Sequence, residues 1–111
     1  MAPWSAEEDV AILYFTSRHI TIPTVTKILE QRGYSRSKSA IHCRLTTLRK
    51  LNPQLESCRD RLDLLGVNHY IYTLLRPCDV ERLVLLTRRD CEIVLEVVTR
   101  RDALRSNTRV T

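Results

Sequence analysis

Residues 36–51 read RSKSAIHCRLTTLRKL, and the pattern of these residues is the strongest indication of the fold. Its apolar residues recur at i, i+4 and i+7, and they would line one face of a helix: Ile41, Leu45 and Leu48. Ser37 stands just before them, where an N-cap serine is favoured. Pro53 follows, and a proline disfavours helical geometry in the residue before it. We therefore expect a helix that ends by Leu51 and rests on a core.

The opposite face of this helix is small, polar and basic. It carries four such residues, with His42 at its flank: Ser39, Cys43, Thr46 and Lys50. The net charge of the chain is +5, and residues 32–51 hold six basic groups and no acidic one: Arg32, Arg36, Lys38, Arg44, Arg49 and Lys50. A local positive patch indicates a polyanion binder. A solvated helix face explains the charge alone equally well.

The composition favours a helical protein. Of 111 residues, 43% are hydrophobic, so the chain can bury a core. Two glycines and four prolines are too few for most all-β architectures or for glycine-rich loops that hold nucleotides. No apolar run approaches the roughly 20 residues of a membrane span, and the first residues lack a signal-peptide pattern. We expect a soluble, intracellular, mostly helical protein.

The sequence offers no pattern for metal binding or catalysis. The four cysteines form no CxxC pair, and the three histidines lack ligand spacing: Cys43, Cys58, Cys78, Cys91, His19, His42 and His69. No nucleophile, base and oxyanion donor come together. We therefore expect no metal, no cofactor, no small-molecule substrate and no enzymatic activity.

Two helices should precede the basic one. Ser5 and Glu8 have the spacing of a capping box, and acidic residues fill the first turn, so the first helix should run to about Arg18 or His19. In the second helix, Thr21 should be the cap, Pro23 should lie in the first turn, and Gly33 should end the helix.

Further helices are predicted in the C-terminal half. Apolar residues at i, i+3, i+7 and i+10 indicate a fourth helix: Leu55, Cys58, Leu62 and Leu65. Gly66 should stop this helix, and Asn68 should cap a fifth helix that runs to Pro77. A short helix is expected over residues 79–86.

The last part of the chain allows two interpretations. Thr87 and Asp90 have capping-box spacing before a helix that would reach about Arg105. The β-branched run over 92–99 also permits a hairpin around residues 88–90, although no glycine or asparagine marks its turn. The tail, residues 106–111, should be frayed.

Three short helices, the third basic and preceded by a tight turn, form a helix-turn-helix pattern. Three stretches also carry a family resemblance: WSAEED at 4–9 followed by Ile12 and Leu13, the segment 22–29, and RSKSAIHCRL at 36–45. Through them, residues 4–51 resemble a Myb/SANT-like domain of the divergent fungal type. Ile22 and Leu45 stand where that family has its second and third tryptophans.

The resemblance implies an all-α fold, a three-helix homeodomain-like helix-turn-helix bundle followed here by a helical extension. It also implies that the third helix enters the DNA major groove. The base-facing positions fall on five residues: Lys38, Ser39, His42, Cys43 and Thr46. Cys43 stands where many members read adenine with an asparagine. A thiol cannot form a bidentate pair with a base, which argues against strong sequence specificity and leaves phosphate binding unaffected.

Cations at both ends of the basic helix suit a phosphate backbone, whatever the family: Arg36 and Lys38 at its start, Arg49 and Lys50 at its end. We therefore expect a double-stranded DNA-binding module, a nuclear regulator of transcription or chromatin. The alternative is a SANT-type protein-interaction module of a chromatin-associated complex. Members of that kind have an acidic third helix, and this one is basic. The extension, residues 52–105, would either enlarge the core or form a homodimer.

Overall fold

The computed structural model describes residues 3–55 and 62–95, and every regular element within them is helical. The elements follow one another in this order: α1 (Ala6–Ser17), α2 (Ile22–Gln31), α3 (Lys38–Leu51), a 3-10 turn η1 (Pro53–Leu55), α4 (Leu64–Leu74) and α5 (Pro77–Val84). Residues 88–95 are also helical. The expected all-α class is confirmed for this part of the chain.

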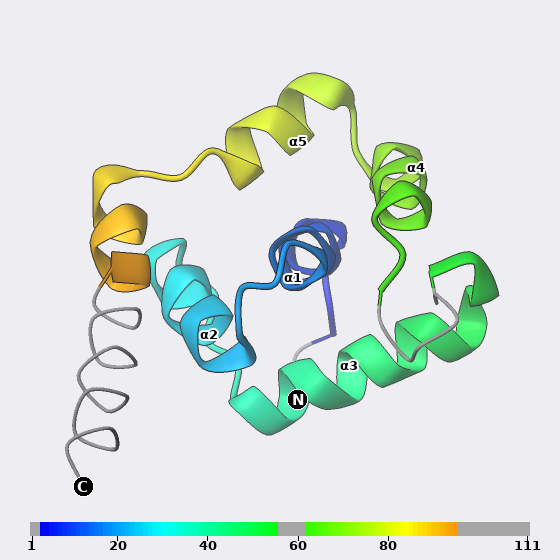
Figure 1. The fold of residues 1–111 in the computed structure, drawn as a ribbon, viewed down its shortest axis with the longest axis horizontal. Coiled ribbons are helices and arrows are strands. Elements are labelled where there is room, and N and C mark those ends of the chain that lie inside the picture. Colours follow the sequence, from blue (N-terminus) through cyan, green and yellow to red (C-terminus); the bar gives the residue numbers. More distant parts are fainter. Residues whose placement is uncertain (1–2, 56–61, 96–111) are drawn as a thin grey trace, which may run out of the picture.

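Helix α1 lies at the centre of the fold, with the other helices around it (Figure 1). Its first turn is the expected capping box: the Ser5 hydroxyl accepts a hydrogen bond from the Glu8 N–H at 3.2 Å, and Glu8 Oε1 accepts one from the Ser5 N–H at 3.3 Å. The residues of its middle are buried in every direction: Val10, Ala11, Ile12 and Leu13. A helix that is apolar all round must be enclosed, and α1 is the element on which the others pack.

Helix α2 begins and ends where the sequence predicts. Thr21 is its N-cap residue and Pro23 lies in its first turn, although the Thr21 hydroxyl bonds the hydroxyl of Thr24 at 3.1 Å and no backbone N–H. The helix ends before Gly33, which has φ +84°, a conformation that favours glycine. The following segment is the turn that leads to Ser37 and α3.

The boundaries of α4 differ from the prediction. Residues 56–61 lie outside the described residues, and Leu62 is not helical. The single helix α4 runs through Gly66, where the sequence predicts that one helix ends and another follows. Its N-cap is Asp63, whose carboxylate accepts a hydrogen bond from the Gly66 N–H at 2.8 Å. Gly66 therefore lies inside the helix and does not end it. A Cβ at this position would overlap the carbonyl oxygen of Gln54, so the glycine permits a close backbone approach.

The C-terminal end confirms the helical interpretation over residues 88–95 and contradicts the hairpin there. Thr87 and Asp90 form the expected capping box, with the Thr87 N–H donating to Asp90 at 2.9 Å and the Asp90 N–H donating to Thr87 at 3.1 Å. The predicted continuation to Arg105 and the frayed tail 106–111 lie outside the described residues.

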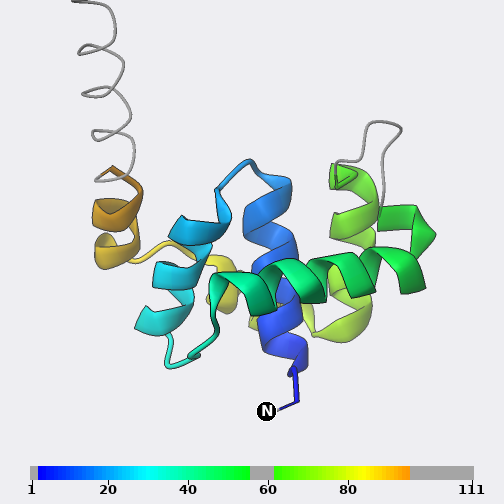
Figure 2. The same cartoon turned by 90° about the horizontal axis from the view of Figure 1, so that it is seen from below.

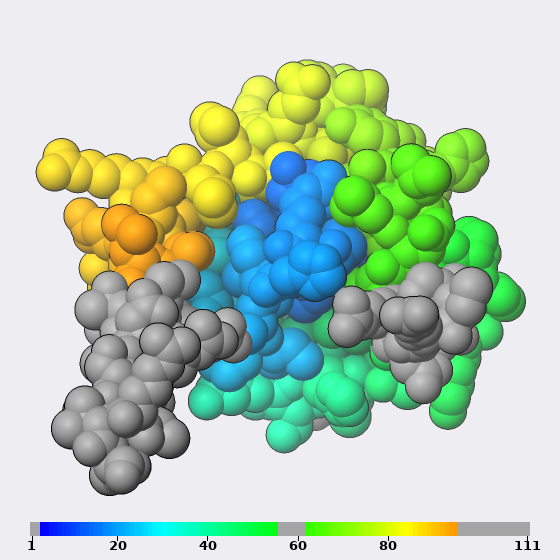
Figure 3. All heavy atoms as spheres, viewed as in Figure 1, coloured from blue at the N-terminus to red at the C-terminus, as the bar shows by residue number. Residues whose placement is uncertain are grey.

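Helices α4 and α5 join the core formed by the first three helices. Val67, Ile71 and Val80 belong to the same buried cluster as the residues of α1, and Figure 3 shows atoms of α4 and α5 packed against those of α1. The extension thus enlarges the core, and a homodimer stays a prediction. Within residues 3–55 and 62–95, no helix has the length and apolar character needed to cross a membrane.

Candidate nucleic-acid interface

Helix α3 crosses one side of α1 and is fixed there by its apolar face (Figure 2). Its start is capped by Ser37, whose hydroxyl accepts a hydrogen bond from the Ala40 N–H at 3.1 Å. The three expected apolar residues are buried: Ile41, Leu45 and Leu48. Of the seven residues on the other side, Thr46 is half-buried and the other six are exposed: Lys38, Ser39, His42, Cys43, Thr46, Thr47 and Lys50. We call this set the outer face of α3.

The outer face of α3 is not covered by the described C-terminal elements. Helix α3 packs against α1, α2 and η1, whereas α5 lies on the far side of α1 (Figure 1). Helix α4 packs against α1, α5 and η1. None of the described helices therefore blocks the exposed side chains from Lys38 to Lys50.

Arg36, which the sequence predicts to contact phosphate, is turned into the protein. Its guanidinium donates two hydrogen bonds to the Glu8 carboxylate, at 2.5 and 3.0 Å, and one to the carbonyl of Pro3 at 2.9 Å. It also lies over the Trp4 ring, 4.3 Å from the centroid. Only 8% of the Arg36 side chain and 7% of the Glu8 side chain are exposed. We therefore remove Arg36 from the candidate interface.

The ion pair between Arg36 and Glu8 also changes their acidities. The hydrogen bond from Arg36 is the main cause that holds the pKa of Glu8 below its ordinary 4.5, against the opposing effect of burial. The same bond raises the pKa of Arg36. Both groups are charged at neutral pH, and the pair ties the start of α3 to the start of α1.

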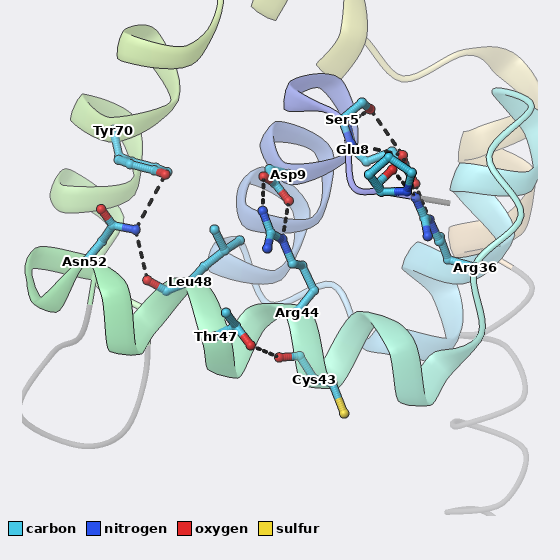
Figure 4. Close-up of polar contacts among 11 residues, drawn as sticks. Ser5, Glu8, Asp9, Arg36, Cys43, Arg44, Thr47, Leu48, Asn52 and Tyr70 are labelled. Atoms are coloured by element: carbon cyan, nitrogen blue, oxygen red, sulfur yellow. Dashed lines mark hydrogen bonds and ion pairs between the residues drawn. The ribbon is translucent and has the colours of Figure 1, made fainter. Parts of the chain in front are cut away.

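Arg44 is a second cation of α3 that is held internally. Its Nε and Nη2 atoms donate to the two carboxylate oxygens of Asp9 at 2.9 and 2.8 Å, a bidentate pair (Figure 4). This hydrogen bonding raises the pKa of Arg44. The pair links the middle of α3 to the first turn of α1.

Arg32 is a third cation of residues 32–51 that is held internally. Its guanidinium lies 2.9 Å from a carboxylate oxygen of Asp90, which is fully buried, and it donates to the carbonyls of Leu83 and Leu85 at 3.1 Å. Burial raises the pKa of Asp90, but the hydrogen bonds from Thr87 and Arg32 together bring it below its ordinary value. Arg32 therefore fastens the helix over 88–95 to the end of α2.

Among the described residues, three of the six cations in the predicted positive patch pair with carboxylates of the fold. The sequence shows six cations and no acid over 32–51, but three of them meet carboxylates from distant parts of the chain: Arg32, Arg36 and Arg44. The sequence indicates Glu8 as a capping-box residue and Asp9 as part of an acidic first turn, and no local spacing marks either as a partner of α3.

The other cations of α3 lie near its two ends. Lys38 and Lys50 are exposed, and within residues 3–55 and 62–95 neither has an ion-pair partner. Arg49 is half-buried in the last turn. The outer face of α3 carries no carboxylate, so nothing on it opposes the approach of an anion.

The middle of the outer face offers few hydrogen-bond donors. The Thr46 hydroxyl donates to the His42 carbonyl and the Thr47 hydroxyl to the Cys43 carbonyl, both at 3.0 Å. Cys43 is an exposed free thiol, and its sulfur points away from α1 (Figure 4). The sequence correctly predicts these side chains on the surface, but it does not show how their polar groups are occupied.

A hollow lies beside α3, between this helix and the N-terminal segment. Its volume is about 420 Å³, and it is lined by Trp4 and by residues of one flank of α3: Ser37, Ser39, Ala40, Cys43, Arg44 and Thr47. Trp4 is half-buried and forms one wall. The resulting surface is shallow, largely apolar and continuous with Cys43.

Comparison with models of known protein families, with curated proteins and with solved structures found no match. Within the described ranges no group of His, Cys, Asp and Glu side chains could hold a metal ion.

Proposed function

We propose that this chain is a double-stranded DNA-binding module, a nuclear regulator of transcription or chromatin, and that it places the outer face of α3 in the major groove. One observation carries the proposal: the described C-terminal elements leave the outer face uncovered, two exposed lysines lie at its ends, and none of its residues is a carboxylate. The Myb/SANT resemblance of residues 4–51 and their homeodomain-like arrangement belong to this proposal.

The dimensions of α3 suit this role. Lys38 and Lys50 are twelve residues apart, or about 18 Å along the helix axis. The major groove of B-DNA is about 12 Å wide and admits a helix. A helix lying in the groove would bring each lysine to a phosphate of an opposite rim. Arg49, in the last turn, lies beside the second of these contacts.

The internal ion pairs limit how strong the electrostatic contribution can be. The logarithm of the binding constant falls with the logarithm of salt concentration by about 0.9 for each phosphate contacted. Contacts from Lys38 and Lys50 give a slope of about −2, whereas all six cations of residues 32–51 would give about −5. The proposal therefore predicts weak binding with a shallow salt dependence.

A second candidate is the SANT-type protein-interaction module of a chromatin-associated complex. The observation that favours it is the neutralisation of Arg32, Arg36 and Arg44, which leaves the third helix less basic than its sequence. The hollow beside Trp4 would then receive an apolar side chain of a partner protein. A partner of this kind would bind without DNA.

Fluorescence anisotropy with a labelled duplex of random sequence tests the proposal. The wild type is compared at about 50 mM and about 200 mM salt with the double variant K38E/K50E. The matched control is R76E/R82E, which makes the same charge change at exposed residues of α5 and its cap. We expect K38E/K50E to weaken binding equally for all sequences and R76E/R82E to have a much smaller effect. Equal loss in both variants, or no binding at low salt, would contradict the proposal.

A further inference from the structure

The chemistry of the outer face of α3 points to one kind of base contact, and this inference rests on the proposed function. The residues that face furthest from α1 lie at i, i+4, i+7 and i+11: Ser39, Cys43, Thr46 and Lys50. None of them is an amide, a guanidinium or a carboxylate. Two of the three arginines of the segment, Arg36 and Arg44, are bound to Glu8 and Asp9. The middle of this line, Cys43 and Thr46, therefore has no bidentate reader of guanine or adenine, and Lys50 at its end is the residue that could contact guanine.

The two threonines present methyl groups more readily than hydroxyl groups. Each hydroxyl hydrogen is directed to a carbonyl of the helix itself, from Thr46 to His42 and from Thr47 to Cys43. The γ-methyl group is the other branch of each side chain, and it forms no hydrogen bond to the backbone. The Cys43 thiol between them is a weak donor and acceptor. This part of the surface therefore offers apolar contact.

Only one feature of the major groove is apolar. Guanine, adenine and cytosine present hydrogen-bonding atoms there, and thymine adds a methyl group at C5. The hollow beside Cys43 and Thr47, walled by Trp4, extends the same apolar surface along the flank of the helix. A projecting methyl group can pack against such a surface, whereas an amino or keto group would lose its hydrogen bonds to water without gaining others.

We infer that the outer face of α3 recognises the C5-methyl group of pyrimidines, through Cys43 and the methyl groups of Thr46 and Thr47. Thymine is the source of this group in unmodified DNA, and 5-methylcytosine presents the same group at the same edge. The preference is modest, because it comes from burying single methyl groups. Burial of one such group changes affinity by about fourfold.

The test compares duplexes that differ only in this methyl group. In the first arm, a duplex rich in A·T pairs is prepared with thymine or with deoxyuridine in its place. In the second arm, a duplex rich in G·C pairs is prepared with cytosine or 5-methylcytosine. We expect the methylated duplex to bind more tightly in both arms, by about fourfold for each methyl group contacted. A gain confined to thymine would assign the preference to A·T pairs and still support methyl recognition.

Two variants assign the preference to the protein. Thr46→Ser removes the methyl group and keeps the hydroxyl that bonds to the His42 carbonyl, and it should reduce the ratio between thymine and deoxyuridine duplexes. Thr26→Ser is the matched control, because Thr26 makes the same type of bond to the Ile22 carbonyl in α2, and it should leave the ratio unchanged.

The two proposals fail in different ways. Equal affinity for methylated and unmethylated duplexes in both arms overturns the inference and leaves DNA binding intact. Failure to bind any of the duplexes overturns the proposed function, and with it methyl recognition.

Discussion

Arg36 at the start of α3 donates two hydrogen bonds to Glu8, the residue that closes the capping box of α1. One carboxylate therefore serves two purposes: it satisfies the N–H of Ser5 and it neutralises a buried arginine from a segment 28 residues away. The consequence is that the chain is fixed two residues before α3 begins, at the point where it enters the helix. The position of its outer face depends on an ion pair that is hidden from solvent.

The Glu8 pair predicts a specific pH dependence of stability. Since the pKa of Glu8 is lower in the folded protein than its ordinary 4.5, unfolding takes up a proton between these two values. The ion pair should therefore contribute its full stabilisation above pH 4.5. The free energy of unfolding should fall as the pH drops through the pKa that Glu8 has in the folded protein. Glu8→Gln keeps an acceptor for the Ser5 N–H but removes the charge. It should be less stable than the wild type at neutral pH, with the difference shrinking in acid.

Urea denaturation at a series of pH values checks this prediction. Asp90 also has a lowered pKa, so the Glu8→Gln variant should retain part of the acid dependence. A difference between the two proteins that stays constant from about pH 7 to about pH 3 would show that Glu8 is not paired in solution.

The cations of α3 should separate into two groups by their effect on stability. Arg44→Met leaves the carboxylate of Asp9, which is 9% exposed, without its two charged donors, and should cost about 1.5–3 kcal/mol. Lys50→Met alters an exposed side chain and should change stability by no more than about 0.5 kcal/mol. Thermal or urea unfolding of the two variants measures both. Similar losses in the two would contradict the internal role of Arg44.

Gly66 should not tolerate a methyl group, although it lies inside a helix. Glycine to alanine ordinarily favours a helix by about 1 kcal/mol. Here the new Cβ would overlap the backbone carbonyl of Gln54, so Gly66→Ala should destabilise the protein by about 1–3 kcal/mol. Urea unfolding checks the sign.

Gly33 gives a useful comparison for that measurement. Nothing lies near its missing Cβ, but its φ is +84°, so Gly33→Ala should cost about 1 kcal/mol through backbone strain alone. A stabilising effect of Gly66→Ala would mean that the turn η1 does not approach α4 in solution.

Asp90 should control the attachment of the last described helix. Asp90→Asn removes the charge that holds Arg32 and weakens the cap at Thr87. Amide hydrogen exchange around Ile93, which is buried, should accelerate by about tenfold or more. Glu92→Gln is the control, because Glu92 pairs with exposed Arg88 and Arg89 on the outside of the same helix. Equal acceleration in both variants would count against the buried pair.

The parts of the fold that follow from local signals could be predicted from the sequence. The capping boxes at Ser5 and Thr87, the end of α2 before Gly33 and the buried face of α3 each depend on residues within one or two turns of one another. Such patterns depend only on residues that are close in sequence, so they can be recognised without knowledge of the tertiary contacts.

The misplaced α4 and the neutralised arginines depend on contacts between distant segments. Gly66 resembles a helix stop until Gln54 is known to lie against it, and Asp63 gives no capping-box pattern of its own. In the same way, Arg36 and Arg44 belong to a basic run in the sequence, and only the crossing of α3 over α1 brings them to Glu8 and Asp9. Charge counted along a chain therefore overestimates charge displayed on a surface.

Nuclear magnetic resonance of the 15N-labelled chain, titrated with a short duplex at low salt, shows which residues the DNA contacts. If the outer face of α3 lies in the major groove, the amide shifts of Lys38, His42, Cys43, Thr46 and Lys50 should change together, and those of α5 should not. Shift changes that spare α3, or that centre on α5 or on the helix over 88–95, would contradict the account.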